Sequence, residues 1–176
     1  MLKTIAIVVV VSIAAILIYA ATKPDSFRVQ RTTTIQSPPD RIFALLTDLR
    51  GWGSWSPYEK RDPAMKRTYS GAGSGKGAVY EWEGNSQVGA GRMEIIDTSP
   101  HKVTIKLDFI KPLEGHNTAE FTLEPKGEST DVTWAMYGPA PYISKLMGVF
   151  LNMDKMIGND FATGLANLKT VAEKQG

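Results

Sequence analysis

The chain has 176 residues, of which 43% are hydrophobic and 22% are charged, and it contains no cysteine. This length suits one globular domain, and the lack of cysteine excludes a disulfide scaffold, a thiolate metal site and a cysteine nucleophile. The formal net charge is +2, but Lys3 and Lys23 are the only charged residues before Asp25, so residues 24–176 carry 18 basic and 18 acidic side chains. Because a nucleic-acid partner requires a basic surface that displaces counterions, none is expected.

An uncharged, apolar segment, Thr4–Thr22, lies near the start of the chain. As a helix it would span roughly 28 Å, close to the thickness of the hydrocarbon core of a bilayer. We therefore expect residues 1–23 to form an N-terminal transmembrane helix and residues 24–176 to form a separate domain. This predicts a membrane protein with a single-pass anchor.

A cleaved signal peptide is the alternative interpretation of this segment. Signal peptides have a shorter apolar core and a cleavage site with small residues, which Ala20-Ala21-Thr22 matches only poorly. The flanking charges leave the side of the membrane undecided. Lys23, Arg28 and Arg31 favour a cytoplasmic domain by the positive-inside rule, whereas the short N-terminal region with Lys3 resembles an export signal.

The body begins with a predicted strand over Phe27–Ile35, where β-branched residues alternate with polar ones. A short helix follows, with Ser37 as its N-cap and Pro38 at its first helical position. Residues 52–62 are expected to form a loop or a helical turn.

From Lys66 onward, the hydrophobic period changes to two residues, which is typical of strands. Short turns between them favour an antiparallel sheet. The expected strands are Lys66–Ser70, Ala78–Glu83, Ser86–Asp97, Lys102–Phe109, Asn117–Glu124 and Ser129–Tyr137.

The last segment, Pro141–Lys174, keeps a period of 3.6 residues over its whole length, and this predicts one long amphipathic helix. The fold class is therefore α+β, with a curved antiparallel sheet of about seven strands around a long C-terminal helix.

The strand parity divides the sheet into an apolar face and a solvated face with charged residues. One helix covers so wide a sheet only if the sheet curls around it, and a cavity between them is then expected; a solid core is the alternative. The predicted ligand-binding residues are Tyr80, Trp82, Met93, Ile95, Leu107, Phe109, Phe121, Trp134, Met136, Phe150, Met153 and Ile157.

Known catalytic motifs are missing from the sequence. The two histidines, His101 and His116, do not have the spacing of a helical metal pair, and the glycine-rich run Gly71–Gly77 lacks the pattern of a phosphate-binding loop. No nucleophile elbow is present. Because the apolar face also offers few titratable groups, we expect no catalytic residue, metal or cofactor.

Several motifs together resemble the START-like (SRPBCC) superfamily, and within it the polyketide cyclase/dehydrase and lipid-transport group. The resemblance covers roughly residues 27–172 and implies the helix-grip fold, in which an antiparallel sheet surrounds a C-terminal helix and a tunnel between them holds lipids, sterols or polyketides. The residues that carry it are Ile35, Ser37-Pro38-Pro39, Ile42-Phe43, Trp52, Trp55-Ser56-Pro57, Asp62-Pro63, Met65, Gly77-Ala78, Tyr80, Trp82, Gly84-Asn85, Gly91, Met93, Ile95, Val132, Trp134, Met136 and Gly138.

Three functions fit this sequence. The first is a membrane-anchored binding or transport module for a hydrophobic small molecule or lipid. The second is an enzyme of the cyclase type, with Tyr80 or His116 as the group that moves protons. The third is an interaction protein similar to the Hsp90-activator-like branch, which would use its surface rather than its cavity.

Overall fold

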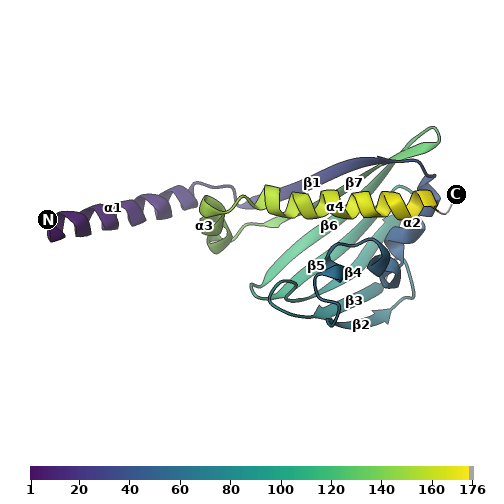
Figure 1. The fold of residues 1–176 in the computed structure, drawn as a ribbon, viewed down its shortest axis with the longest axis horizontal. Coiled ribbons are helices and arrows are strands. Elements are labelled where there is room, and N and C mark those ends of the chain that lie inside the picture. Colours follow the sequence, from purple (N-terminus) through teal and green to yellow (C-terminus); the bar gives the residue numbers. More distant parts are fainter. Residues whose placement is uncertain (175–176) are drawn as a thin grey trace.

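The computed structural model describes residues 1–174, and Figure 1 shows a long N-terminal helix that projects from an α+β body. The elements of the body run from a first strand through short helices and six further strands to two C-terminal helices. In chain order, the elements are α1 (Leu2–Ala21), β1 (Ser26–Ile35), α2 (Pro39–Thr47), the 3-10 helices η1 (Leu49–Ser54) and η2 (Tyr58–Lys60), β2 (Lys66–Gly71), β3 (Ala78–Glu83), β4 (Ala90–Ser99), β5 (Lys102–Lys111), β6 (Gly115–Lys126), β7 (Ser129–Pro139), α3 (Tyr142–Phe150) and α4 (Met153–Lys174).

Within residues 1–174 the strands form one seven-stranded sheet in the order β1-β7-β6-β5-β4-β3-β2, and all neighbours are antiparallel. Register shifts at Ala90/Gly91 and Ile95/Asp97 interrupt the β4–β5 ladder, and such bulges bend a sheet. The helix α4 lies along the sheet and packs mainly against β1 (Figure 1). The expected α+β class and helix-grip arrangement are therefore confirmed.

The C-terminal segment is two helices, so the prediction of one helix over Pro141–Lys174 is wrong. The chain is extended at Leu151 (φ −116°, ψ 131°), and α4 begins two residues later. The side chain of Asn152 accepts a hydrogen bond from the backbone N–H of Lys155 at 2.9 Å. Asparagine is among the strongest N-capping residues. Asn152 therefore starts a new helix, although the 3.6-residue hydrophobic period of the sequence continues across this position.

The entry to α2 also differs from the prediction. Pro38, not Ser37, is the residue before the helix, and Pro39 is its first residue. Ser37 is buried, and its carbonyl accepts a hydrogen bond from the Thr130 hydroxyl at 2.8 Å. The Ser37 side chain thus joins the core beside β7 instead of capping the helix.

The strand β4 begins at Ala90, four residues later than predicted. The preceding residues form a turn in which the carbonyl of Asn85 accepts hydrogen bonds from the N–H groups of Val88 and Gly89. Gly89 has a φ of +64°, a conformation that glycine adopts without steric cost.

The apolar face predicted from strand parity is the concave face, and its buried residues form the core with α2, η1 and α4. An aromatic cluster lies at its centre: the Trp134 ring stacks on Phe161 at 4.2 Å and on Phe121 at 5.0 Å between ring centroids. Further core residues fill the end of the body farthest from α1, and they include Ile35, Ile42, Leu46, Val103, Leu123, Val132, Leu165 and Leu168.

Two glycines allow α4 to lie close to the sheet. A Cβ atom at Gly164 would lie 2.6 Å from Cζ3 of Trp134, and one at Gly158 would lie 1.9 Å from the Arg31 guanidinium. Arg31 of β1 also donates hydrogen bonds to both carboxylate oxygens of Asp154, at 3.2 and 3.0 Å. The N-terminal half of α4 is therefore held against β1 by close packing and by an ion pair.

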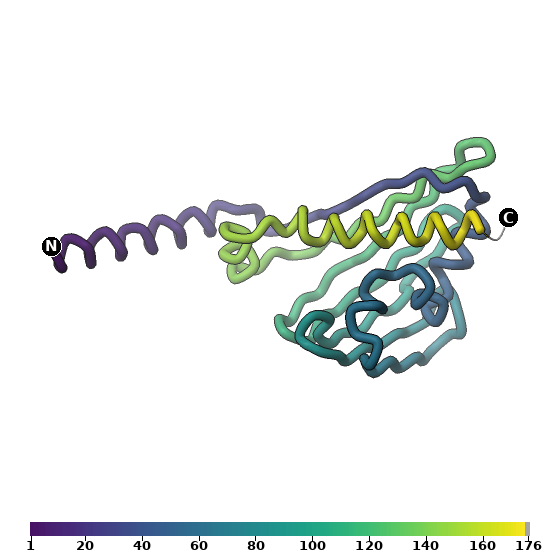
Figure 2. Tube along the Cα trace, viewed as in Figure 1, coloured from purple at the N-terminus to yellow at the C-terminus, as the bar shows by residue number. Residues whose placement is uncertain are grey.

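The helix α1 extends away from the body as a rod, as the tube in Figure 2 shows. Among the described residues it is the one helix long and apolar enough to cross a membrane. Its C-terminal turns contact α3, and Ala20 is its one fully buried residue.

Candidate functional site

A cavity of about 600 Å³ lies between the sheet and α4, in the half of the body nearest α1. Apolar side chains from β5, β6 and β7 form one wall, and Ile157 and Phe161 of α4 form part of the opposite wall. The loops between β3 and β4 and between β5 and β6 complete the lining, together with α3. The body is thus filled at the far end and hollow at the end near α1.

Nine of the twelve predicted ligand-binding residues line this cavity. The alternation along the strands brings seven of them to one face, as expected from period-two burial, and the other two lie on α4. They are Tyr80, Trp82, Met93, Leu107, Phe109, Trp134, Met136, Met153 and Ile157. Their contact with a ligand stays a prediction.

The other three predicted residues do not line the cavity. Ile95 and Phe121 are fully buried in the filled part of the core, where Phe121 stacks on Trp134. Phe150 is 69% exposed, because it ends α3 and does not belong to the helix that packs on the sheet. The helical spacing between Phe150 and Met153 spans the break between α3 and α4, so these two residues do not lie on the same face of one helix.

The position of Trp82 depends on a glycine on the neighbouring strand. Gly91 pairs with Trp82 across β3 and β4, and a Cβ atom at Gly91 would lie 2.3 Å from Cζ2 of the indole. The indole N–H donates to the Val88 carbonyl at 3.1 Å. The missing side chain at Gly91 therefore lets the ring lie flat against β4 and expose its surface to the cavity.

One polar cluster in the cavity wall was not predicted. The Tyr80 hydroxyl donates to Oε1 of Glu59 at 2.5 Å, and Nε of Arg67 donates to Oε2 of the same carboxylate at 2.7 Å. The Glu59 side chain is only 9% exposed, and both Glu59 and Tyr80 line the cavity. Strand parity could not find Glu59, because this residue comes from the 3-10 helix η2.

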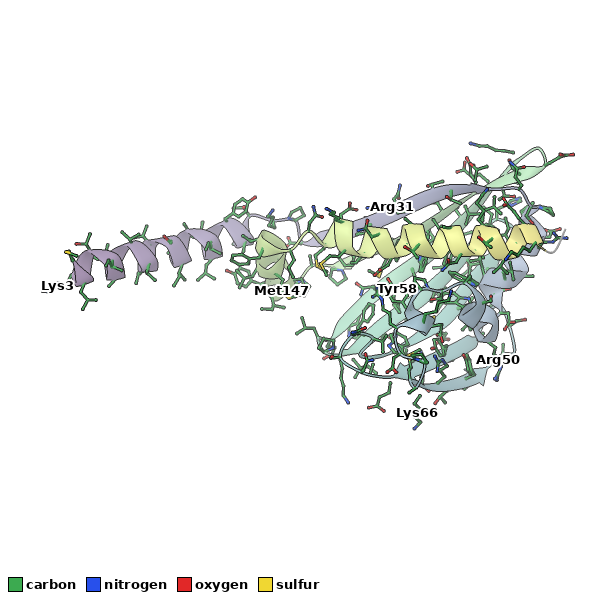
Figure 3. All side chains as sticks on the ribbon, viewed as in Figure 1. Lys3, Arg31, Arg50, Tyr58, Lys66 and Met147 are labelled. Carbon is green, nitrogen blue, oxygen red and sulfur yellow. The ribbon has the colours of Figure 1, made fainter. Side chains whose placement is uncertain are left out.

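Two cavity tyrosines are held in their neutral form. Burial raises the pKa of Tyr80 well above its usual value, and its hydrogen bond to Glu59 raises it further. Burial also raises the pKa of Tyr58, with a smaller contribution from the nearby charge of Asp160. Tyr58 is labelled beside α4 in Figure 3, and its ring lies 6.5 Å from that of Trp134 in β7. Both phenols are therefore hydrogen-bond donors across the physiological pH range.

Neither histidine contributes to the cavity. His116 is exposed, and its Nδ1 lies 2.7 Å from Oδ1 of Asp108. His101 lies in the turn between β4 and β5. Among residues 1–174, no group of three or more His, Asp or Glu side chains is arranged to hold a metal ion.

The fold and the cavity agree with the comparisons to known proteins. Residues 26–173 match the family described as polyketide cyclase/dehydrase and lipid transport. No protein with a curated description matches the chain.

Solved structures share the fold at low sequence identity. The protein CV1439 from Chromobacterium violaceum has a TM-score of 0.59 at 15% identity, over 86% of this chain and 99% of that one. The di-domain aromatase/cyclase StfQ from the steffimycin biosynthetic pathway has a TM-score of 0.63 at 10% identity, over 85% and 51%. Aha1 from Colwellia psychrerythraea has a TM-score of 0.56 at 18% identity, over 84% and 96%.

These likenesses indicate a common architecture, while the sequence match over residues 26–173 identifies the family. The chain belongs to the polyketide cyclase/dehydrase and lipid transport family, within the START-like superfamily.

Proposed function

We propose that the protein is a membrane-anchored module that binds or carries a hydrophobic small molecule or lipid in the cavity between the sheet and α4. The observation that carries this proposal is the cavity itself: its volume of about 600 Å³ lies within the range of small-molecule sites, roughly 300–1,000 Å³. Residues 24–176 would form the ligand-binding domain.

The lining indicates the chemistry of the ligand. Leu107, Phe109 and Met136 offer apolar surface, and burial of a ligand against them gains about 0.8 kcal/mol per methylene group. Glu59 and Tyr80 add a hydrogen-bonded polar pair to this wall. A ligand with a long apolar part and one hydrogen-bonding group fits this arrangement better than a pure hydrocarbon.

The membrane anchor of the proposal is α1. Its side chains are almost entirely exposed although the segment is strongly apolar. The body does not cover these side chains, whereas the hydrocarbon core of a bilayer would remove them from water. Tethering raises the local concentration of membrane lipid at the domain. That advantage applies to a module that takes its ligand from the bilayer.

Mass spectrometry after mild extraction of the full chain tests the binding function. We expect a stoichiometric amphiphilic ligand that is lost when the protein is denatured. A protein that stays empty, and that also binds no fluorescent fatty acid added to it, would contradict the proposal.

Tryptophan fluorescence locates the ligand. Trp134 lines the cavity, whereas Trp55 is buried away from it. Trp52 and Trp82 also line the cavity, so we expect Trp134→Phe to reduce the ligand-dependent change in fluorescence and the matched variant Trp55→Phe to retain it in full. Equal losses in the two variants would place the ligand outside the cavity.

Fractionation tests the anchor. The full chain should pellet with membranes and resist a carbonate wash, whereas a chain that starts at Pro24 should stay in the supernatant. A mature protein whose N-terminus lies near Lys23 would instead identify residues 1–23 as a cleaved signal peptide.

A second candidate function, catalysis of the cyclase type, is favoured by the cluster of Glu59, Tyr80 and Arg67. The Tyr80 hydroxyl donates its one proton to Glu59, so a substrate carbonyl that replaced Glu59 as the acceptor would be oriented by this phenol. Incubation of the extracted ligand with the protein tests this. A change in ligand mass or absorbance that requires Tyr80, and that Tyr80→Phe abolishes without loss of binding, would support an enzyme. A ligand that remains unchanged would favour the binding module.

A further inference from the structure

The end of the sheet nearest α1 is the end at which the cavity lies. The strands β1, β4 and β6 begin at this end, and β3, β5 and β7 finish there, as their antiparallel pairing requires. The lining reaches the chain segment that follows α1, at Lys23 and Pro24, and reaches α3 as well. If α1 crosses a bilayer, this end of the cavity faces the membrane.

Exposed apolar side chains gather at the same end. After α1, nine large hydrophobic residues among those described are exposed, and eight of them lie at this end. The exception is Ile96, on the distant part of β4. The eight residues are Ile110, Leu113, Tyr142, Ile143, Phe150, Leu151, Met153 and Met156. Six of them, from Tyr142 to Met156, belong to α3, the link after it and the start of α4, and exposed apolar surface of this kind marks a site of interaction with a protein or a membrane.

The contact between α3 and α1 determines how deeply this surface would lie in a membrane that α1 crosses. The Tyr142 hydroxyl donates to the Leu17 carbonyl at 2.9 Å. Leu17 precedes the end of α1 at Ala21 by four residues, which is about 6 Å along the helix axis. A helix in the membrane interface buries its apolar face to a similar depth, about 5–10 Å.

The boundary of the membrane is marked on α1 itself. The Lys23 ammonium lies 4.7 Å from the centre of the Tyr19 ring. Tyrosine and lysine at the end of an apolar helix are typical anchors at the level of the lipid headgroups. Tyr142 therefore lies beside the part of α1 that passes through this region.

The helix α3 also forms part of the cavity lining, through Ser144, Met147 and Gly148. Met147 projects at the junction of α1 and the body (Figure 3). A Cβ atom at Gly148 would have nothing within 4 Å, so the structure is open at this position. One short helix thus contacts the membrane anchor, carries exposed apolar residues and lines the cavity.

We infer that α3 lies in the headgroup region of the leaflet that α1 enters, and that the ligand, an amphiphilic lipid, passes beside α3 directly between the bilayer and the cavity. This inference rests on the anchoring role proposed for α1. The occupant of the apolar surface is the lipid bilayer, because α1 continues from that surface and the Tyr142 hydroxyl is hydrogen-bonded to the Leu17 carbonyl of α1.

Site-directed labelling of the full chain in phosphatidylcholine/phosphatidylglycerol vesicles tests the position of α3. The chain contains no cysteine, so single-cysteine variants carry an environment-sensitive fluorophore at one site only. We expect labels at Ile143→Cys and Phe150→Cys to shift to shorter emission wavelengths and to be quenched by lipids with a shallow quencher. The control is Ile96→Cys, an exposed apolar site far from α1, which should report water.

A label at Val10→Cys, within α1, separates two failures. If Val10 reports lipid while Ile143 and Phe150 report water, the anchor stands and the inference about α3 is wrong. If Val10 also reports water, the proposed anchoring itself is wrong. Labels on α3 that are shielded from both water and lipid quenchers would indicate a second protein on this surface and would also overturn the inference.

Transfer of a fluorescent phospholipid or fatty acid from the same vesicles tests the route. We expect Gly148→Leu to narrow the opening and to slow transfer several-fold, while the amount bound at equilibrium changes less. The matched control is Gly73→Leu, which adds the same side chain to the loop between β2 and β3, where a Cβ atom also meets nothing within 4 Å. Equal transfer rates in the two variants would contradict passage beside α3.

Discussion

At the scale of single residues, the contact between Gly164 and Trp134 determines how closely α4 approaches the sheet. We expect Gly164→Ala to destabilise the protein by about 1–3 kcal/mol, the usual cost of overpacking a core, because its methyl group would lie 2.6 Å from Cζ3 of Trp134. The free energy of unfolding from chemical denaturation measures this effect.

The control for this prediction is the same substitution at Gly148, where a Cβ atom has nothing within 4 Å. There alanine should leave stability unchanged or raise it by about 0.5–1 kcal/mol, because glycine weakens a helix interior. A Gly164→Ala variant as stable as Gly148→Ala would show that α4 can move away from Trp134 without cost.

The same scale shows how far a sequence predicts a site. Strand parity identified Leu107, Phe109 and Met136, because side chains alternate strictly between the two faces of a sheet. It gave no signal for Glu59, whose side chain is brought into the cavity wall by the 3-10 helix η2 and fixed there by Arg67. Residues outside regular elements have no period, so their direction follows only from the folded chain.

At the scale of elements, the break between α3 and α4 changes what the C-terminal segment can do. Its apolar residues keep helical spacing across Leu151 and Asn152, and the periodicity therefore predicted one helix. In the sequence, the indication of a second helix was Asn152, because asparagine is a strong N-capping residue. Apart from the start of β4, the strand boundaries were predicted to within two residues, because short turns and a two-residue period limit each strand, whereas the helix boundary depended on a single side chain.

Met153 provides a test of the cavity at this scale. It is the first residue of α4, is 39% exposed and lines the cavity. We expect Met153→Trp to lower the affinity for a fluorescent fatty acid, because the larger ring occupies cavity volume, and to leave the free energy of unfolding nearly unchanged. Equilibrium titration and chemical denaturation measure the two quantities.

Met156→Trp is the matched control, because Met156 is 53% exposed and lies outside the lining. It should preserve affinity as well as stability. A loss of about 1–3 kcal/mol in Met153→Trp alone would instead indicate that the space before Met153 is already filled.

At the scale of the whole molecule, the neutral tyrosines make stability depend on alkaline pH. The pKa values of Tyr58 and Tyr80 lie above the ordinary value of 10.0 in the folded protein, so the unfolded chain loses these protons at lower pH than the folded chain does. By linkage, their contribution to stability is complete below pH 10 and decreases as the pH rises above it.

Urea denaturation on both sides of this pH measures the effect. We expect the midpoint to fall above pH 10, and to fall less in a Tyr58→Phe/Tyr80→Phe double variant. Parallel losses in the two proteins would assign the alkaline decrease to other groups, such as Lys102 and Lys126, whose pKa values are raised by Glu120 and Asp131.

The separation of a filled far end from a hollow near end has a consequence for how the molecule opens. Cooperative local unfolding requires less free energy where fewer apolar contacts are lost. Amide hydrogens near Met136, Leu107 and Phe109 should therefore exchange with deuterium faster than those near Leu123, Val132 and Leu165, although all but the last belong to strands of one sheet. Ligand binding should slow exchange at the first group and leave the second unchanged, so that an occupied protein becomes evenly protected from one end to the other.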